Sequence, residues 1–198
     1  MKYKYKNITV SQKGLSLIES AMVLAISAVI VSGVLYYYNQ AQENRKLEEG
    51  IKQIQTIAAS VNKLYTNSVN PPQGDDNTVE AISAISGIPT IMAHGTKMFT
   101  TPSGQWVQFW TGDNNTYVLE TQVQSVSSCI SYATLNMGTI MARKTEIHAN
   151  DQQYGGNSNS GNSTNFSLSP SIASNACEQA ENAKGNDNNI KVRYTLRY

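Results

Sequence analysis

The chain has 198 residues, of which 40% are hydrophobic and 15% charged, with a formal net charge of +1 and two cysteines. Its length fits one domain, and its composition excludes a polytopic membrane protein, a highly charged disordered chain and a disulfide-dense mini-protein. A net charge so close to zero also argues against nucleic acid as a partner, because phosphate binding needs a clear excess of Lys and Arg.

The N-terminal part of the chain is unlike the rest. Residues 1–14 carry four lysines and no acidic residue, and in the apolar segment 15–38, LSLIESAMVLAISAVIVSGVLYYY, the one acidic or basic residue is Glu19. As a helix this segment would be about 36 Å long, which is enough to cross the roughly 30 Å of a hydrocarbon core. The lysines predict a cytoplasmic N-terminus, with the bulk of the chain on the other side of the membrane.

Two simpler interpretations of this segment compete with a functional membrane helix. An ordinary secretory signal would end at small residues such as those at 31–33, but the apolar run is long for such a signal and continues beyond them. A plain single-pass anchor leaves Glu19 unexplained, although its carboxylate lies near enough to one end to reach the head groups. Because a charge inside a membrane helix is costly, a function for Glu19 is the other hypothesis, and the residues around it favour that one.

Glu19 is the fifth residue after Gly14. If the chain is cut after Gly14, Leu15 gains a free amine close to the turn that carries the carboxylate. Among packed copies, the amine of one subunit and the carboxylate of another would neutralise each other. In a medium of low dielectric this pairing would favour one register, because a misplaced subunit would bury an unpaired charge.

Residues 13–38, KGLSLIESAMVLAISAVIVSGVLYYY, resemble the class III signal of type IV pilins: a basic leader, a glycine at the cut and an acid fifth in an apolar helix. The segments CISYATLNMGT (129–139) and PSIASNAC (170–177) resemble the bundlin family within the type IVb class. The resemblance implies cleavage by a prepilin peptidase after Gly14, N-methylation of Leu15 and a role for Glu19 as the assembly carboxylate. It also implies the type IV pilin fold and a Gram-negative bacterium as the source.

The chain departs from the type IVa pattern in its long leader, in its first mature residue, which is Leu instead of Phe, and in having no proline before Pro71. A proline kink in the helix is therefore not expected. Gly33 and Gly50 are the predicted weak points of the helix, where packing would unwind it most easily.

The long helix is expected to cover residues 15–67, with residues 15–38 in the membrane or the filament core. Apolar residues recur at steps of three and four on its second half, at Leu47, Ile51, Ile54, Ala58, Val61 and Tyr65, and predict a face that packs under a head domain. Pro71, Pro72 and Gly74 end the helix, and residues 68–198 form the predicted head.

In the head, patterning predicts helices at 78–86, 127–137 and 170–183, strands at 105–110, 116–123 and 190–198, and an exposed polar loop at 150–165. The residues TGDNN (111–115) predict a hairpin between the first two strands. Trp106 and Trp110 are assigned to the head core. The fold class is α+β, with an antiparallel sheet packed on the long helix.

Cys129 and Cys177 are the two cysteines of the chain. They form no C-x-x-C motif, and two distant thiols and two scattered histidines do not make a metal site. In an exported domain a disulfide is the favoured interpretation, and it matches the C-terminal disulfide-bonded region of type IV pilins.

The sequence offers few residues that are arranged as in a known catalytic motif. His94 and His148 have no recognisable nucleophile or carboxylate motif nearby, and the chain has no phosphate loop, no G-x-S-x-G and no zinc motif. No catalytic residue, cofactor or metal is expected.

The resemblance implies the major structural subunit of a type IVb pilus, a homopolymer used for adhesion, bundling and bacterial aggregation. The alternative is a minor pilin or a type II secretion pseudopilin. The implied partners are the prepilin peptidase, an inner-membrane assembly platform with its ATPase, and a receptor on a host-cell surface. The subunit would span the inner membrane before assembly and belong to an extracellular fimbrium afterwards.

Overall fold

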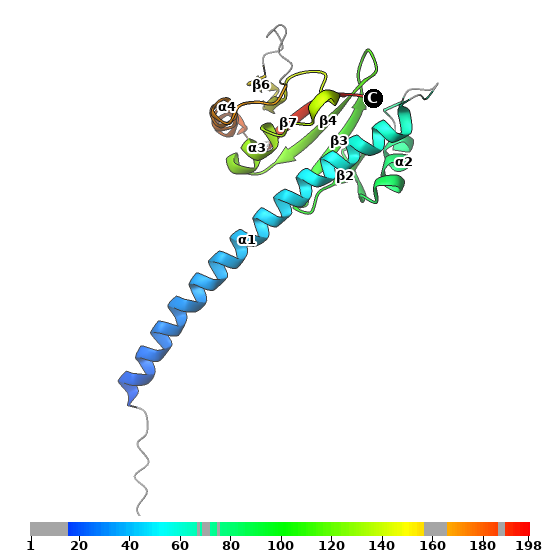
Figure 1. Cartoon of the computed structure of the whole chain (residues 1–198). Helices are drawn as coiled ribbons and strands as arrows, with labels where there is room; N and C mark the ends of the chain where they lie inside the picture. Colours follow the sequence, from blue (N-terminus) through cyan, green and yellow to red (C-terminus); the bar gives the residue numbers. More distant parts are fainter. Residues whose placement is uncertain (1–15, 67, 69–71, 75, 157–165, 186–188) are drawn as a thin grey trace, which may run out of the picture. The chain divides into compact units, whose positions relative to one another are not determined.

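The computed structural model describes residues 16–66, 68, 72–74, 76–156, 166–185 and 189–198 (Figure 1). The long helix α1 is Leu17–Tyr65, two residues shorter at each end than expected, and residues 15 and 67 lie outside the described part. Contacts divide the chain into two compact units, Met1–Gln42 and Glu43–Tyr198. The second half of α1 therefore belongs to the head.

The head contains a seven-stranded sheet in which every neighbouring pair is antiparallel. The strand order is β1-β2-β3-β4-β7-β5-β6, so the C-terminal strand lies inside the sheet, between β4 and β5. The strands are β1 (Thr90–Ala93), β2 (Thr96–Thr100), β3 (Trp106–Thr111), β4 (Thr116–Val123), β5 (Glu146–Ala149), β6 (Gln152–Tyr154) and β7 (Ile190–Arg197). The predicted α+β class with an antiparallel sheet is confirmed.

Three further helices complete the head: α2 (Asp76–Ser86), α3 (Val126–Ala133) and α4 (Pro170–Ala183), with a short 3-10 turn, η1 (Gly138–Ile140). The bounds of α4 are those predicted. By contrast, α3 ends four residues before the predicted Met137. Thr134 is the C-cap, where its N–H still bonds to the Ile130 carbonyl, whereas the N–H of Leu135 bonds to the Tyr132 carbonyl three residues back, so the regular helical pattern stops. Asn136 then accepts a hydrogen bond from the N–H of Gly138 through its side chain, which stabilises a turn.

One face of the sheet packs on the second half of α1. Three residues of the predicted apolar stripe, Ile54, Ala58 and Val61, are buried there in one core cluster with residues from every strand except the two edge strands, β1 and β6. The other three, Leu47, Ile51 and Tyr65, are half-buried against this cluster. The buried hydroxyl of Tyr117 donates to the carbonyl of Ala58 at 3.4 Å. Near β7 the same cluster is completed by α3 and α4.

None of the helices in the described part of the chain is drawn over the other face of the sheet in Figure 1. Trp106 and Trp110 lie on this face and are half-buried, so their assignment to the core is wrong. Along β3 the side chains alternate, and Val107 and Phe109 are the ones that point into the core.

Candidate functional site

The start of α1 carries the predicted assembly site. Gly14 and Leu15 lie outside the described residues, so the structure describes only Glu19 of the three predicted N-terminal site residues. The backbone N–H of Ser16 donates to Glu19 Oε2 at 2.8 Å, and the backbone N–H of Glu19 donates to Ser16 Oγ at 3.2 Å. This reciprocal pair is a capping box.

The capping box identifies Ser16 as a residue that the sequence reasoning missed. Its signal was present as S-x-x-E at the start of the apolar segment. Both bonds satisfy backbone donors at a helix end that would otherwise be unpaired, and the negative carboxylate also lies at the positive end of the helix dipole. The carboxylate of Glu19 is thus stabilised by the first turn of its own helix.

The apolar segment that follows Glu19 is exposed on all sides. Among the described residues, α1 is the one helix long and apolar enough to cross a membrane, and none of its most apolar stretch is buried. Exposure of Leu24, Ile26 and Val29 lies between 62% and 73%. The Ser27 hydroxyl donates to the Val23 carbonyl at 2.7 Å, so this polar group also needs no water. Such a surface requires lipid or other apolar helices around it.

The helix is continuous through both glycines that the sequence marked as weak points. Gly33 has open space where a side chain would lie, whereas Gly50 is buried and a Cβ there would overlap the hydroxyl of Tyr132. Burial raises the pKa of Tyr132 to about 12, so the phenol next to Gly50 is neutral. Gly50 therefore has a packing role, since it lets α3 lie close to α1.

Cys129 of α3 and Cys177 of α4 form the predicted disulfide. Both residues are fully buried, and their Cα atoms are 5.9 Å apart. The bond joins two parts of the chain separated by 48 residues and ties the two helices that cover one end of the sheet. The fold prediction of a disulfide-bonded C-terminal region is confirmed.

The uncovered face of the sheet carries a charged cluster centred on Glu120, which is 3% exposed. The Nε and Nη2 groups of Arg193 both donate to Glu120 Oε2, at 2.9 and 2.7 Å. Lys191 Nζ lies 3.9 Å from Oε1 of the same carboxylate. These two cations also cover the tryptophans: Lys191 lies 5.7 Å from the ring centre of Trp106, and Arg193 lies 5.2 Å from that of Trp110. The two cations therefore reduce the area of the tryptophan rings that is exposed to water.

The two histidines have ordinary structural positions. His94 lies in the turn between β1 and β2 with a φ of 52°, and His148 Nε2 is 3.0 Å from Glu146 Oε2. The hydrogen bond with His148 lowers the pKa of Glu146; burial opposes this, and the positive charges of His148, Arg193 and Arg143 assist it. Within the described ranges, no three His, Cys, Asp or Glu side chains gather as metal ligands.

Comparisons with known proteins show which family the chain belongs to. A solved type IVb pilin from Salmonella typhi is 15% identical, with a TM-score of 0.49, over 75% of this chain and 97% of the other. The chain is 33% identical to the major structural subunit of bundle-forming pilus from Escherichia coli O127:H6 (strain E2348/69 / EPEC) over 193 residues. This alignment covers 94% of the chain and 95% of that protein. The same values hold for the protein of that name from Escherichia coli O111:H-. Residues 39–197 match the family model described as Bundlin. The chain therefore belongs to the bundlin family.

Proposed function

We propose that this chain is the major structural subunit of a type IVb pilus, which polymerises through its N-terminal helix into surface fibres. The observation that carries the proposal is the 33% identity to two major subunits of bundle-forming pili across 94% of the chain. The exposed apolar half of α1 supports it, because such a helix needs lipid before assembly and other helices afterwards. A structural role of this kind is non-enzymatic.

Maturation precedes assembly in this proposal. A prepilin peptidase removes residues 1–14 by cutting after Gly14, and Leu15 becomes the N-methylated N-terminus. The subunit waits in the inner membrane with its N-terminus on the cytoplasmic side, where the lysines of the leader are retained. An inner-membrane platform and its ATPase then drive its extraction into the fibre.

Glu19 guides each subunit into register. The bond from the Ser16 N–H uses Oε2, and a carboxylate offers about four lone-pair sites. The amine of a neighbour's Leu15 can therefore bind the same carboxylate while the capping box stays formed. The paired charges neutralise each other, and the apolar helices then pack side by side. Cohesion comes from this close packing, because lipid is as apolar as the helices it gives way to.

The head contributes the outer surface of the fibre. We assign adhesion, bundling and bacterial aggregation to it, including binding to a receptor on host cells. Residues 157–165, most of the predicted polar loop, lie outside the described residues, while the beginning of that loop contains strand β6. We infer that the outer surface also includes the charged face of the sheet, because the opposite face packs on α1.

Glu19→Ala tests the assembly mechanism. We expect a processed, membrane-resident subunit that forms few fibres, because the neighbour's amine loses its counter-charge. The matched control is Glu80→Ala, which removes an acid on α2 whose 3.0 Å pair with Lys97 is exposed and contributes little. Electron microscopy and the amount of sheared fibre are the readouts, and normal piliation in Glu19→Ala would contradict the role of the carboxylate.

Mass analysis of the mature N-terminus tests the maturation steps. N-methyl-Leu15 supports the proposal, whereas a chain that begins at Val34 would indicate ordinary secretion. Abundance separates the major subunit from a minor pilin or a type II secretion pseudopilin. The major subunit dominates sheared surface fibres, and either alternative would be scarce in them.

A further inference from the structure

Three tyrosines, Tyr36, Tyr37 and Tyr38, end the apolar segment of α1, and their exposed fractions are 74%, 75% and 58%. Because an α-helix has 3.6 residues per turn, consecutive side chains point about 100° apart. The three phenols therefore surround more than half of the helix. A face that docks on one protein partner would instead repeat at steps of three and four residues. Their arrangement suits a partner that surrounds the helix.

A lipid bilayer surrounds a helix in this way. Tyrosine has an apolar ring and a polar hydroxyl, and it is enriched at the boundary between hydrocarbon and head groups. The sequence changes character at these residues, from SAVIVSGVL before them to the polar NQAQENRK after them. Gln42 Nε2 donates to the Tyr38 hydroxyl at 2.7 Å, so this hydroxyl already interacts with the polar side of the boundary.

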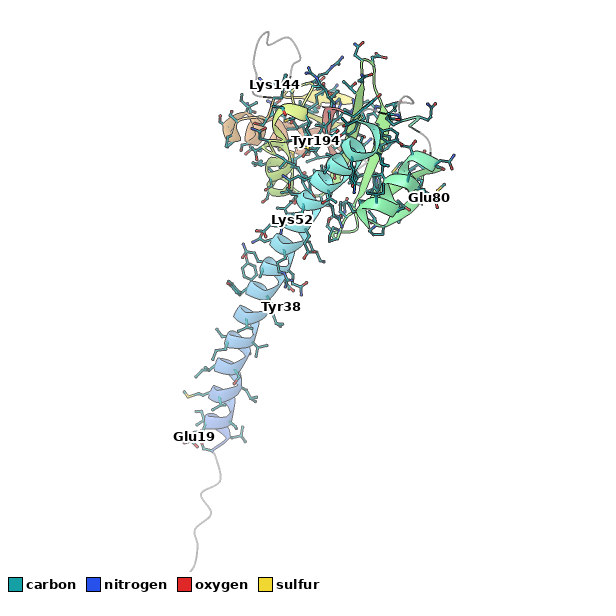
Figure 2. The ribbon with its side chains drawn as sticks, turned by 45° about the vertical axis from the view of Figure 1, so that its right-hand side comes forward. Glu19, Tyr38, Lys52, Glu80, Lys144 and Tyr194 are labelled. Carbon is teal, nitrogen blue, oxygen red and sulfur yellow. A yellow bond between two sulfur atoms is a disulfide. The ribbon has the colours of Figure 1, made fainter. Side chains whose placement is uncertain are left out.

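The tyrosines and Glu19 are separated along the helix axis by about the thickness of a membrane. At 1.5 Å per residue, Tyr36 lies about 26 Å and Tyr38 about 29 Å from Glu19 along the helix axis. Figure 2 shows Glu19 and Tyr38 at the two ends of this stretch of α1. The hydrocarbon core is about 30 Å thick. With the phenols at one surface of the membrane, Glu19 reaches the other surface, where a carboxylate costs much less than at the bilayer centre.

We propose that Tyr36, Tyr37 and Tyr38 form a belt that binds the head-group region of the periplasmic leaflet and thereby holds Glu19 at the cytoplasmic boundary before assembly. The proposal rests on the membrane orientation in the proposed function. It adds a residue set that fixes the depth of the subunit. At this depth the capping box of Ser16 and Glu19 lies at the boundary, beside the predicted cleavage site.

The test measures where the helix leaves the membrane. Both native cysteines are in the disulfide, so Leu35→Cys, Asn39→Cys or Glu43→Cys adds a single free thiol to the full-length chain. Spheroplasts of cells that lack the assembly ATPase are treated with a membrane-impermeant maleimide. We expect labelling at Asn39→Cys and Glu43→Cys but not at Leu35→Cys.

The belt is then altered in the same three backgrounds. Replacing all three tyrosines by Leu extends the apolar segment, so the boundary should move by about three residues, or 4.5 Å. Labelling of Asn39→Cys is then lost while that of Glu43→Cys is kept. The matched control replaces the tyrosines by Trp, which also favours the interface, and we expect it to leave both positions labelled.

Equal labelling of Asn39→Cys in the Leu and native backgrounds would overturn the belt, as would labelling of Leu35→Cys in the native background. An unmoved boundary together with lost fibres in assembly-competent cells would assign the tyrosines to contacts between subunits, which also overturns it. Absence of labelling at both Asn39→Cys and Glu43→Cys in the native background would overturn the membrane orientation, and with it this proposal. N-terminal analysis of Leu15 tests pilin maturation separately.

Discussion

The disulfide between Cys129 and Cys177 offers a prediction whose magnitude follows from the structure. The bond closes a segment with a sequence separation of 48. In the chain-entropy model, loss of such a cross-link frees the unfolded chain and lowers the free energy of unfolding by about 4 kcal/mol. Small domains have about 5–15 kcal/mol in total, so the head should become marginal without the bond.

The variant that isolates this effect is Cys129→Ala with Cys177→Ala. Both sites are fully buried, so serine would add the cost of two buried hydroxyl groups to the loss of the bond. The single variant Cys129→Ser leaves an unpaired thiol as well, and we expect it to lower the amount of pilin in cells through proteolysis. A comparison of the Ala pair with the reduced native protein separates the cross-link from the packing of the sulfur atoms.

Urea unfolding of the full-length chain in detergent micelles, followed by the fluorescence of Trp106 and Trp110, measures the change. Both tryptophans lie on β3 and therefore report on the sheet. A decrease close to 4 kcal/mol agrees with the entropic argument. A decrease of less than about 1 kcal/mol would refute it, since the closed segment would then have little freedom to gain in the unfolded state.

Three other predictions concern the core and the charged face. Gly50→Ala should destabilise the head by about 1–3 kcal/mol, because the added methyl group would overlap the hydroxyl of Tyr132. Adding Tyr132→Phe removes that hydroxyl and should restore part of the free energy of unfolding measured in urea. Tyr194→Phe removes a buried 2.6 Å bond to the Tyr132 carbonyl and should cost about 1–3 kcal/mol, and a thermal midpoint equal to the native one would contradict that bond. Because the pKa of Glu146 is lowered in the folded state, its carboxylate stabilises the head above the ordinary carboxyl pKa, and this stabilisation is lost as the pH falls through the folded-state pKa. Glu146→Gln should therefore weaken the decrease of the free energy of unfolding at acidic pH. His148→Gln should weaken it partly.

Patterns that depend on neighbours along the chain predicted the structure well. The bounds of α4 and the clean alternation of β7 follow from local periodicity, and Ile54 and Val61 are buried as the stripe on α1 predicts. The cysteine pairing also followed, because a chain with two cysteines has one intramolecular pairing. These features need no knowledge of the sheet order.

Features that depend on distant contacts were missed. Strands β1, β2, β5 and β6 are too short to show a clear alternation, and β6, which reads QQY at the edge of the sheet, has no apolar pattern either. The turn between β5 and β6 uses Asn150 and Asp151, both with positive φ, residues that are equally typical of a loop.

The tryptophans were misplaced for a related reason. Alternation along β3 separates Trp106 and Trp110 from Val107 and Phe109 but does not say which pair faces the helix. That choice depends on β7, two strands away, which supplies Lys191 and Arg193 to the same face as the tryptophans across β4. The packing of Val107 and Phe109 in the core with α1 favours the same choice. Both contacts are between distant parts of the chain and are absent from local sequence.

In the proposed function the first half of α1 has to be stable both in lipid and in a fibre, and the hydrogen bonds of its polar groups are compatible with both. In lipid, the capping box satisfies Ser16 and Glu19, and the Ser27 hydroxyl bonds to its own helix, so no donor among these groups needs a partner from outside. In a fibre, the same helix can exchange lipid for protein without breaking these bonds. In the proposed assembly, packing of the apolar helices supplies the cohesion, and the charge of Glu19, which the capping box leaves for a neighbouring amine to neutralise, fixes the register. We therefore predict that fibre yield falls far more when the charge at Glu19 is removed than when any one apolar residue between it and the tyrosines is replaced.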